Sequence, residues 1–508
     1  MRFNFKRLVL RVPKFVLSIA SKAREFQFRY TRLPTTEHIS VPLKTNPDCV
    51  DMAFGCCSMD IQFQNVLLLS FSFMLVFTSF QTMGNIEQTV LRSINMDEPS
   101  FTGNGYISLS IIYGVFSISN WVAPSIVAVL KEKKSMLAGA VLYTAFIASF
   151  LYPKTWLLYL MSAVLGIGAA VIWTAQGSYL AICSDETTMS RNSGVFWAIL
   201  QSSMFFGNTF VFFAFDTKDE SAKIEESTRI LVFSVLTGVA IIGVICMLFL
   251  RTPGRVDRTV PMLDIQLPEH GAVAAFKKSL KLFTKKEMVL LSFTFFYTGI
   301  ELSFFSGVYS TSVGSTEALG TIAKRLVGLS GILVGAGEVI GGALFGLLGA
   351  RTVKNGRDPI VLLGFLCHTV AFYMIFINLP DASPLGSTGG LSYIKPPSAV
   401  IAMICSFLLG FGDACYNTQI YSILGGLFPD DSAPVFALFK FTQSAAAAAS
   451  FYYSSLLTLR IQLGILQIFC FIGSFTFFLV EWASVQKKIA ATSCAEEDPD
   501  DEYRIDKS

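Results

Sequence analysis

Long apolar segments recur along the whole chain, and most are long enough to cross a membrane as a helix. A membrane-spanning helix needs about 20 mainly apolar residues. The pattern predicts an all-α membrane protein with twelve transmembrane helices. We place them at 66–91, 105–130, 135–152, 156–182, 194–215, 229–250, 288–312, 326–349, 359–378, 399–424, 433–457 and 462–482.

Polar and charged segments separate these helices into two groups of six. The predicted parts are a basic N-terminal segment (1–65), a first bundle (66–250), a central loop (251–287), a second bundle (288–485) and an acidic tail (486–508). The first 33 residues hold nine Lys or Arg and one acid. They fit a mitochondrial-type presequence or a cytoplasmic segment on anionic lipid, and the basic polytopic body favours the second.

Basic residues are distributed unevenly between the two sides of the predicted bundle. The two termini and the loops on their side carry 29 Lys or Arg, whereas the opposite loops carry nine. Because basic loops stay in the cytoplasm, we expect both termini there. The pattern does not distinguish the plasma membrane from an endolysosomal membrane.

Composition agrees with this class and narrows the chemistry. Of the 508 residues, 53% are hydrophobic and 15% are charged, and the net charge is only +3. Ten Cys and three His residues show no metal-ligand spacing, and the sequence has no nucleophile or zinc-protease motif. We therefore expect no enzyme activity, metal, cofactor or nucleic-acid partner.

The two halves of the chain echo each other. LGIGAAVIWTAQ (165–176) matches LGFGDACYNTQ (409–419), and VFWAILQSS (195–203) matches VFALFKFTQS (435–444). Gly114 in the second segment corresponds to Gly335 in the eighth. Two six-helix pseudo-repeats joined by a basic loop form the layout of major facilitator transporters, whose substrate cavity lies between the halves.

Several motifs resemble one branch of that superfamily. WTAQGSYLAICSDETTMSRNSGVFWAILQSSMFFGN, FTSFQTMGNIEQTVLRSI and LLGFGDACYNTQIYSILG are similar to the Unc-93-like family, particularly its animal orphan transporters. The resemblance covers about 66–485, and Glu87 departs from it because relatives have a small neutral residue there. It implies twelve helices, no enzyme activity and an unsettled substrate. Other members act as a channel regulatory subunit or as a trafficking chaperone.

Five ionisable side chains lie well inside predicted helices, namely Glu87, Glu301, Glu338, Asp413 and Lys440. Each costs about 2.5–3.5 kcal/mol at the centre of a membrane helix, so they are expected to face the bundle interior. One interpretation is a proton or cation relay in a central cavity. The other is a structural ion pair. We expect Lys440 to pair with one of the carboxylates.

Uncharged polar residues extend the candidate site. Gln81 and Asn85 lie in the first helix, which is the repeat partner of the helix containing Glu301. The remaining candidates are Trp173, Gln176, Gln201 and Asn417. Trp173 suits either a substrate ring or cation, or simple packing. Small-residue pairs at Gly331/Gly335 and Gly342/Gly346 predict close helix packing.

The segment GLLGARTVKNGRDP (346–359) loosely resembles the facilitator gating motif. Its basic residues Arg351, Lys354 and Arg357 are candidates for a gate latch on acidic groups. The alternative is an ordinary basic cytoplasmic loop.

Two functional hypotheses follow. The first is a secondary transporter in the lipid bilayer that moves an unknown small-molecule solute by alternating access, coupled to a proton or cation. The second is a non-transporting regulatory or trafficking subunit for a membrane-protein partner, either a channel or a receptor.

Overall fold

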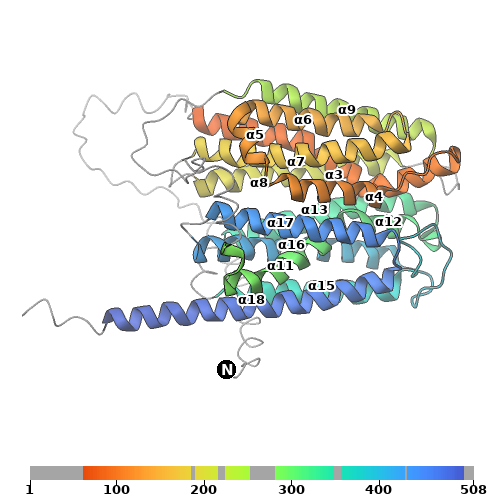
Figure 1. The fold of residues 1–508 in the computed structure, drawn as a ribbon. Coiled ribbons are helices and arrows are strands. Elements are labelled where there is room, and N and C mark those ends of the chain that lie inside the picture. The colour runs from red at the N-terminus through yellow and green to blue at the C-terminus, as the bar shows by residue number, and fades with distance from the viewer. Residues whose placement is uncertain are drawn as a thin grey trace, which may run out of the picture. The chain divides into compact units, whose positions relative to one another are not determined.

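The computed structural model describes residues 61–184, 189–215, 224–251, 281–347, 356–428 and 432–496, and nearly all of them are helical. The first-half helices are α3 (Ile61–Asp97), α4 (Gly105–Ser119), α5 (Ala123–Leu130), α6 (Glu132–Ser149), α7 (Thr155–Ile182), α8 (Met189–Ala214) and α9 (Glu226–Leu248). From Asn65 onward the chain forms one unit. Figure 1 shows these helices grouped together.

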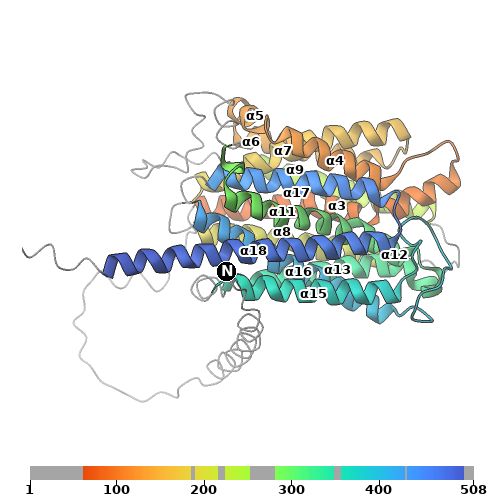
Figure 2. The same cartoon turned by 60° about the horizontal axis from the view of Figure 1, so that its bottom comes forward.

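The second half forms another group of helices beside the first (Figure 1). Its elements are α11 (Lys286–Ser303), η2 (Phe304–Val308), α12 (Tyr309–Gly314), η3 (Glu317–Ile322), α13 (Ala323–Leu347), α15 (Asp358–Asn378), α16 (Ala399–Leu427), α17 (Ser432–Ser454) and α18 (Leu459–Glu496). The helix α18 continues past the predicted end at 482 and extends beyond its neighbours (Figure 2). Part of the predicted tail is therefore helical.

Each of the twelve predicted segments coincides with a helix or an interrupted run of helices. Among the described residues, nine helices are long and apolar enough to cross a membrane, and the bent α4–α5 pair would be a tenth. The other two are α6, which begins with three charged residues, and α17, which carries Lys440 and Gln443. Twelve membrane crossings therefore stay a prediction.

Two predicted helices are interrupted. The second bends by 72° between α4 and α5, and Pro124 lies in the first turn of α5, where a missing N–H is tolerated. The seventh contains the π-helical stretch η2, which begins three residues after Glu301. Such π-helical turns are frequent at functional sites.

The most extensive contacts between the two halves are made by two helix pairs, α8 with α13 and α4 with α17, and we call this interface the seam. Under the sequence repeat, α8 corresponds to α17 and α4 to α13, so these two pairs are equivalent. A Cβ at Gly114 would lie 3.8 Å from Ala448 of α17, and one at Gly335 would lie 3.0 Å from Met204 of α8. The repeated glycines therefore face the same seam from opposite halves.

Close packing at the seam follows one stripe of α13. A Cβ at Gly328 would lie 2.7 Å from the backbone nitrogen of Phe212, and one at Gly331 would overlap Asn208. The prediction of close packing at Gly331 and Gly335 is confirmed. It is wrong for Gly342, because no atom lies within 4 Å of the place of its Cβ, and the surroundings of Gly346 lie outside what the structure describes.

Candidate functional site

Three carboxyl groups predicted at membrane depth gather in the second half. Glu301 comes from α11, Glu338 from α13 and Asp413 from α16, and their exposed fractions are 1%, 7% and 9%. Asp413 interacts electrostatically with both glutamates, and Glu338 acts on Glu301 as well. We call these residues the acid cluster. Charging several buried carboxyl groups together is costly, so the cluster favours binding a proton or a cation.

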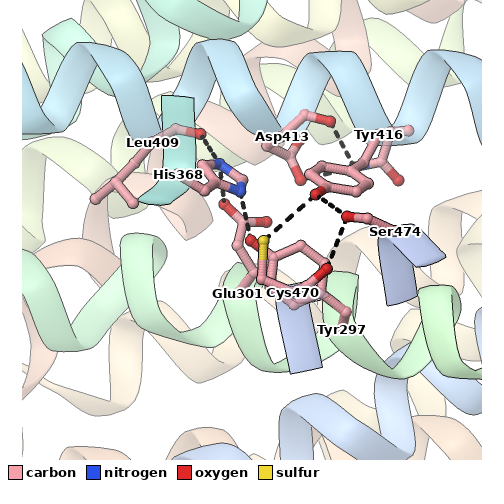
Figure 3. Close-up of polar contacts among 9 residues, drawn as sticks. Tyr297, Glu301, His368, Leu409, Asp413, Tyr416, Cys470 and Ser474 are labelled. Carbon is pink, nitrogen blue, oxygen red and sulfur yellow. Dashed lines mark hydrogen bonds and ion pairs between the residues drawn. The ribbon is translucent and has the colours of Figure 1, made fainter. Parts of the chain in front are cut away.

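A histidine that the sequence interpretation missed completes the cluster. His368 of α15 is fully buried, and its Nε2 lies 3.4 Å from Glu301 Oε1 (Figure 3). The same nitrogen lies 3.0 Å from the carbonyl oxygen of Leu409, and Nδ1 lies 2.5 Å from the hydroxyl of Tyr297. These partners suit a neutral imidazole that donates from Nε2 and accepts at Nδ1.

Local sequence explains how His368 reaches this position. The ring stacks on Tyr416 at 5.6 Å, and a Cβ at Gly412 would overlap it. Because Gly412 has no side chain, the imidazole of His368 on α15 can pack directly against α16. The sequence did contain a signal for His368, because an ionisable residue inside an apolar membrane segment is a functional candidate.

Asp413 and Lys440 are near each other but do not form the predicted ion pair. Asp413 accepts a 2.7 Å hydrogen bond from Asn417, one turn along α16. The Lys440 ammonium donates to Gln443 Oε1 at 2.9 Å and lies 4.7 Å from the centre of the Phe439 ring. Within the described ranges no carboxylate lies within 4 Å of it, so the expected pairing is wrong. Amide and aromatic contacts take its place.

A side chain of the first half forms a hydrogen bond with the acid cluster. Gln201 of α8 donates a 2.5 Å hydrogen bond from Nε2 to Glu338 Oε2. Gln201 and Glu338 were both predicted site residues, and the structure joins them across the seam.

The first-half candidates mainly hold helices together. Asn85 donates to Asn208 Oδ1 at 2.7 Å and to the Val327 carbonyl of α13 at 3.1 Å, and Gln81 accepts from Ser203. Trp173 lies in an aromatic group with Phe73, Phe77 and Trp197. These aromatic contacts agree with a packing role for Trp173. Gln176 is buried on the same helix.

Glu87 lies apart from the acid cluster. It is completely buried in α3 and interacts with Ser108 of α4. Ser108 in turn bonds Ser162 of α7 at 2.9 Å. These partners all belong to the first half.

The candidate latch is described in part, because Arg351 and Lys354 lie outside the described residues. Arg357 Nη1 lies 2.9 Å from Glu481 Oε2 of α18, and its Nε donates to Ser422 Oγ of α16 at 2.8 Å. Both charged side chains are at most 5% exposed. The pair joins α15, α16 and α18 within the second half. Glu481 was missed because it lies at the end of its predicted helix.

An apolar cavity lies away from the acid cluster. It has a volume of about 370 Å³ and lies between α3, α8 and α9, lined by apolar residues such as Leu75, Phe206 and Val239. None of the predicted site residues lines it. Among described residues, no group of three His, Cys, Asp or Glu is placed to hold a metal ion.

Comparison with solved structures shows the fold. A crystal structure of a variant of the peptide transporter POT with alafosfalin has a TM-score of 0.60 at 13% identity, and the match covers 82% of this chain and 95% of that one. Another POT structure, with sulfate, has a TM-score of 0.59. The chain therefore has the fold of a major facilitator transporter.

Comparison with protein sequences gives the family. The model described as "Ion channel regulatory protein UNC-93" matches residues 101–478. The UNC93-like protein MFSD11 of Xenopus laevis is 49% identical, over 84% of this chain and 97% of the relative. The protein unc-93 homolog A of Homo sapiens is 24% identical, over 80% and 91%. The chain is thus a multi-pass membrane protein that belongs to the UNC-93 family.

Proposed function

We propose that this protein is a secondary transporter that moves a small solute across a membrane by alternating access, coupled to proton or cation binding at Glu301 and Asp413. The observation that carries the proposal is the hydrogen bond between Gln201 and Glu338. It is a contact between the halves at a residue that also interacts with Asp413. Charge on the cluster and the position of the halves are therefore linked.

Alternating access requires two arrangements of the halves around one site. With the cluster charged, Glu338 is a strong acceptor for Gln201, because hydrogen bonds to ionised groups are roughly twice as strong as neutral ones. Binding a proton or a cation weakens that attraction and the repulsion within the cluster. The two cluster states thus favour different arrangements, which is what coupling requires.

Reconstitution into liposomes tests this proposal. A proton gradient is expected to drive uptake of at least one member of a broad solute panel. Glu301→Gln, which mimics the protonated carboxyl group, is expected to abolish gradient-driven uptake while solute exchange continues. Glu98→Gln, at an exposed carboxyl group outside the cluster, is the matched control. Flat uptake across the panel, or gradient-driven uptake by Glu301→Gln, would contradict the proposal.

A second candidate function rests on the family description as a channel regulatory protein. In that case the helical body or the basic N-terminal segment would bind a channel or receptor without transport. Affinity purification that returns a stoichiometric membrane partner, with Glu301→Gln harmless to the cellular phenotype, would favour this function.

The proposal includes the orientation of the protein in the membrane. The charge distribution supports both termini in the cytoplasm, which places Arg357 and Glu481 near the cytoplasmic end.

A further inference from the structure

Lys440 is a half-buried cation near the middle of α17, and among the described residues one hydrogen bond is formed by its ammonium. Its ammonium donates to Gln443 Oε1 at 2.9 Å. The Gln443 amide is oriented by Thr298 of α11, whose hydroxyl accepts from Nε2 at 3.2 Å and donates to the Phe295 carbonyl. Gln443 therefore presents its oxygen to Lys440 and holds the ammonium in place.

An ammonium carries three N–H donors, and Gln443 uses one. Within the part of the chain that the structure describes, Lys440 forms no ion pair, unlike Arg357, whose carboxylate partner lies 2.9 Å away. Cations inside membrane helices are rare and mark substrate or ion pathways when they occur. The remaining donors of Lys440 point to an anionic ligand.

The surroundings limit what that anion is. The Lys440 ammonium lies 4.7 Å from the ring centre of Phe439 and 5.7 Å from that of Tyr421, so apolar faces flank it. Asp413 lies within electrostatic range of the same ammonium. A multiply charged anion would be repelled by the acid cluster, whereas one negative charge on an apolar body suits a single ammonium beside aromatic rings.

We propose that Lys440 binds the carboxylate of an organic monocarboxylate, with the partly exposed ring of Tyr421 against its apolar part. This assignment rests on the proposed function and names its substrate class. Neutralising Asp413 or Glu301 with a proton lowers the repulsion that the bound carboxylate feels. Proton and carboxylate therefore assist each other's binding, and linkage makes this assistance reciprocal.

The binding test uses the purified full chain and a matched set of probes. The probes are benzoate, phenylacetate and butyrate, each with its primary amide and the corresponding amine, and sodium chloride alone. A probe well above its Kd stabilises the folded state, so at least one carboxylate is expected to raise Tm by about 2 °C or more. The amides, the amines and chloride are expected to leave it unchanged.

Three variants separate binding from folding. Lys440→Met keeps the length of the side chain and removes the charge, so we expect an undiminished Tm without ligand and no shift with carboxylate. Lys440→Arg is expected to retain the shift. Lys285→Met is the control, because Lys285 also lies over an aromatic ring, 5.3 Å from the centre of Phe428, but outside the helices.

Three results would overturn the assignment: no shift with any carboxylate, an equal shift with amides, or an undiminished shift in Lys440→Met. The outcome is separate from that of the transport proposal. Carboxylate binding through Lys440 together with flat uptake would contradict transport alone. Uptake only of neutral or cationic solutes would leave transport standing and overturn the role of Lys440.

Discussion

The amide of Gln201 donates a 2.5 Å hydrogen bond to the carboxyl group of Glu338, and the two residues come from opposite halves of the molecule. Glu338 is itself within electrostatic range of Asp413. One side-chain contact at the seam is therefore sensitive to the charge of the acid cluster.

Gln201→Leu removes the donor and leaves Glu338 without it. We expect a loss of about 1–3 kcal/mol in the free energy of unfolding, because a buried polar group left without its hydrogen-bond partner costs this much. Gradient-driven uptake should fall as well. Ser202→Ala is the control, because that hydroxyl donates to the Ile199 carbonyl of its own helix. Equal Tm and uptake in both variants would contradict the role of the contact.

The pair of Arg357 and Glu481 should behave as a buried ion pair. Arg357→Met removes the charged partner of the buried Glu481 carboxylate, which keeps the hydrogen bond from the backbone N–H of residue 357, and we expect destabilisation by about 3–5 kcal/mol. The double variant Arg357→Met/Glu481→Leu should recover most of that loss, since it leaves no buried charge behind. Thermal unfolding measures both.

The comparison pair is Lys154 and Glu98, which are also 2.9 Å apart but about 40% exposed. Lys154→Met should leave Tm unchanged, because solvent screens exposed ion pairs. A double variant as unstable as Arg357→Met would show that Arg357 acts through packing instead of charge.

Gly328→Ala tests the seam between α8 and α13. Its Cβ would lie 2.7 Å from the backbone nitrogen of Phe212, and a backbone atom in a helix cannot swing away as the end of a flexible side chain can. The two helices must shift apart, and we expect a lower Tm. Gly342→Ala on the same helix meets no atom within 4 Å and should raise stability by up to about 1 kcal/mol through helix propensity. The reverse order of the two Tm values would contradict this seam.

Tyr297→Phe removes the hydroxyl that lies 2.5 Å from His368 Nδ1. The buried ring nitrogen loses its partner, so the free energy of unfolding should fall by about 1–3 kcal/mol. Tyr452→Phe, at a position 57% exposed, should have no effect. If the two substitutions were equal, His368 would not be held by Tyr297.

The sequence predicted the helices well because membrane-spanning helices must satisfy their backbone groups internally and present long apolar segments. The bend after α4 and the clustering of the acidic residues had weaker signals in the sequence than the helices had. Glu301, Glu338 and Asp413 were recognised singly from their burial in apolar segments. Their meeting depends on how α11, α13 and α16 pack, which no local pattern encodes.

The residues that sequence reasoning missed share one property. His368 and Glu481 bind partners 41 to 124 residues away, so their roles appear only after the helices are packed. Lys440 shows the opposite error. Charge complementarity suggested a carboxylate partner. In the structure the ammonium instead donates to Gln443, which lies one turn away on the same helix.

The central claim is that protons on the acid cluster change the arrangement of the two halves. Genetically encoded spin labels at Lys134 and Gln486, one in each half, would report it through distance distributions measured at pH 8 and pH 5.5. We predict that the populations shift with pH in the wild-type protein and stay at one position in the Glu301→Gln/Asp413→Asn variant. The claim would be contradicted if the wild-type distance distribution were the same at both pH values, or if the distribution of the variant shifted with pH as the wild-type distribution does.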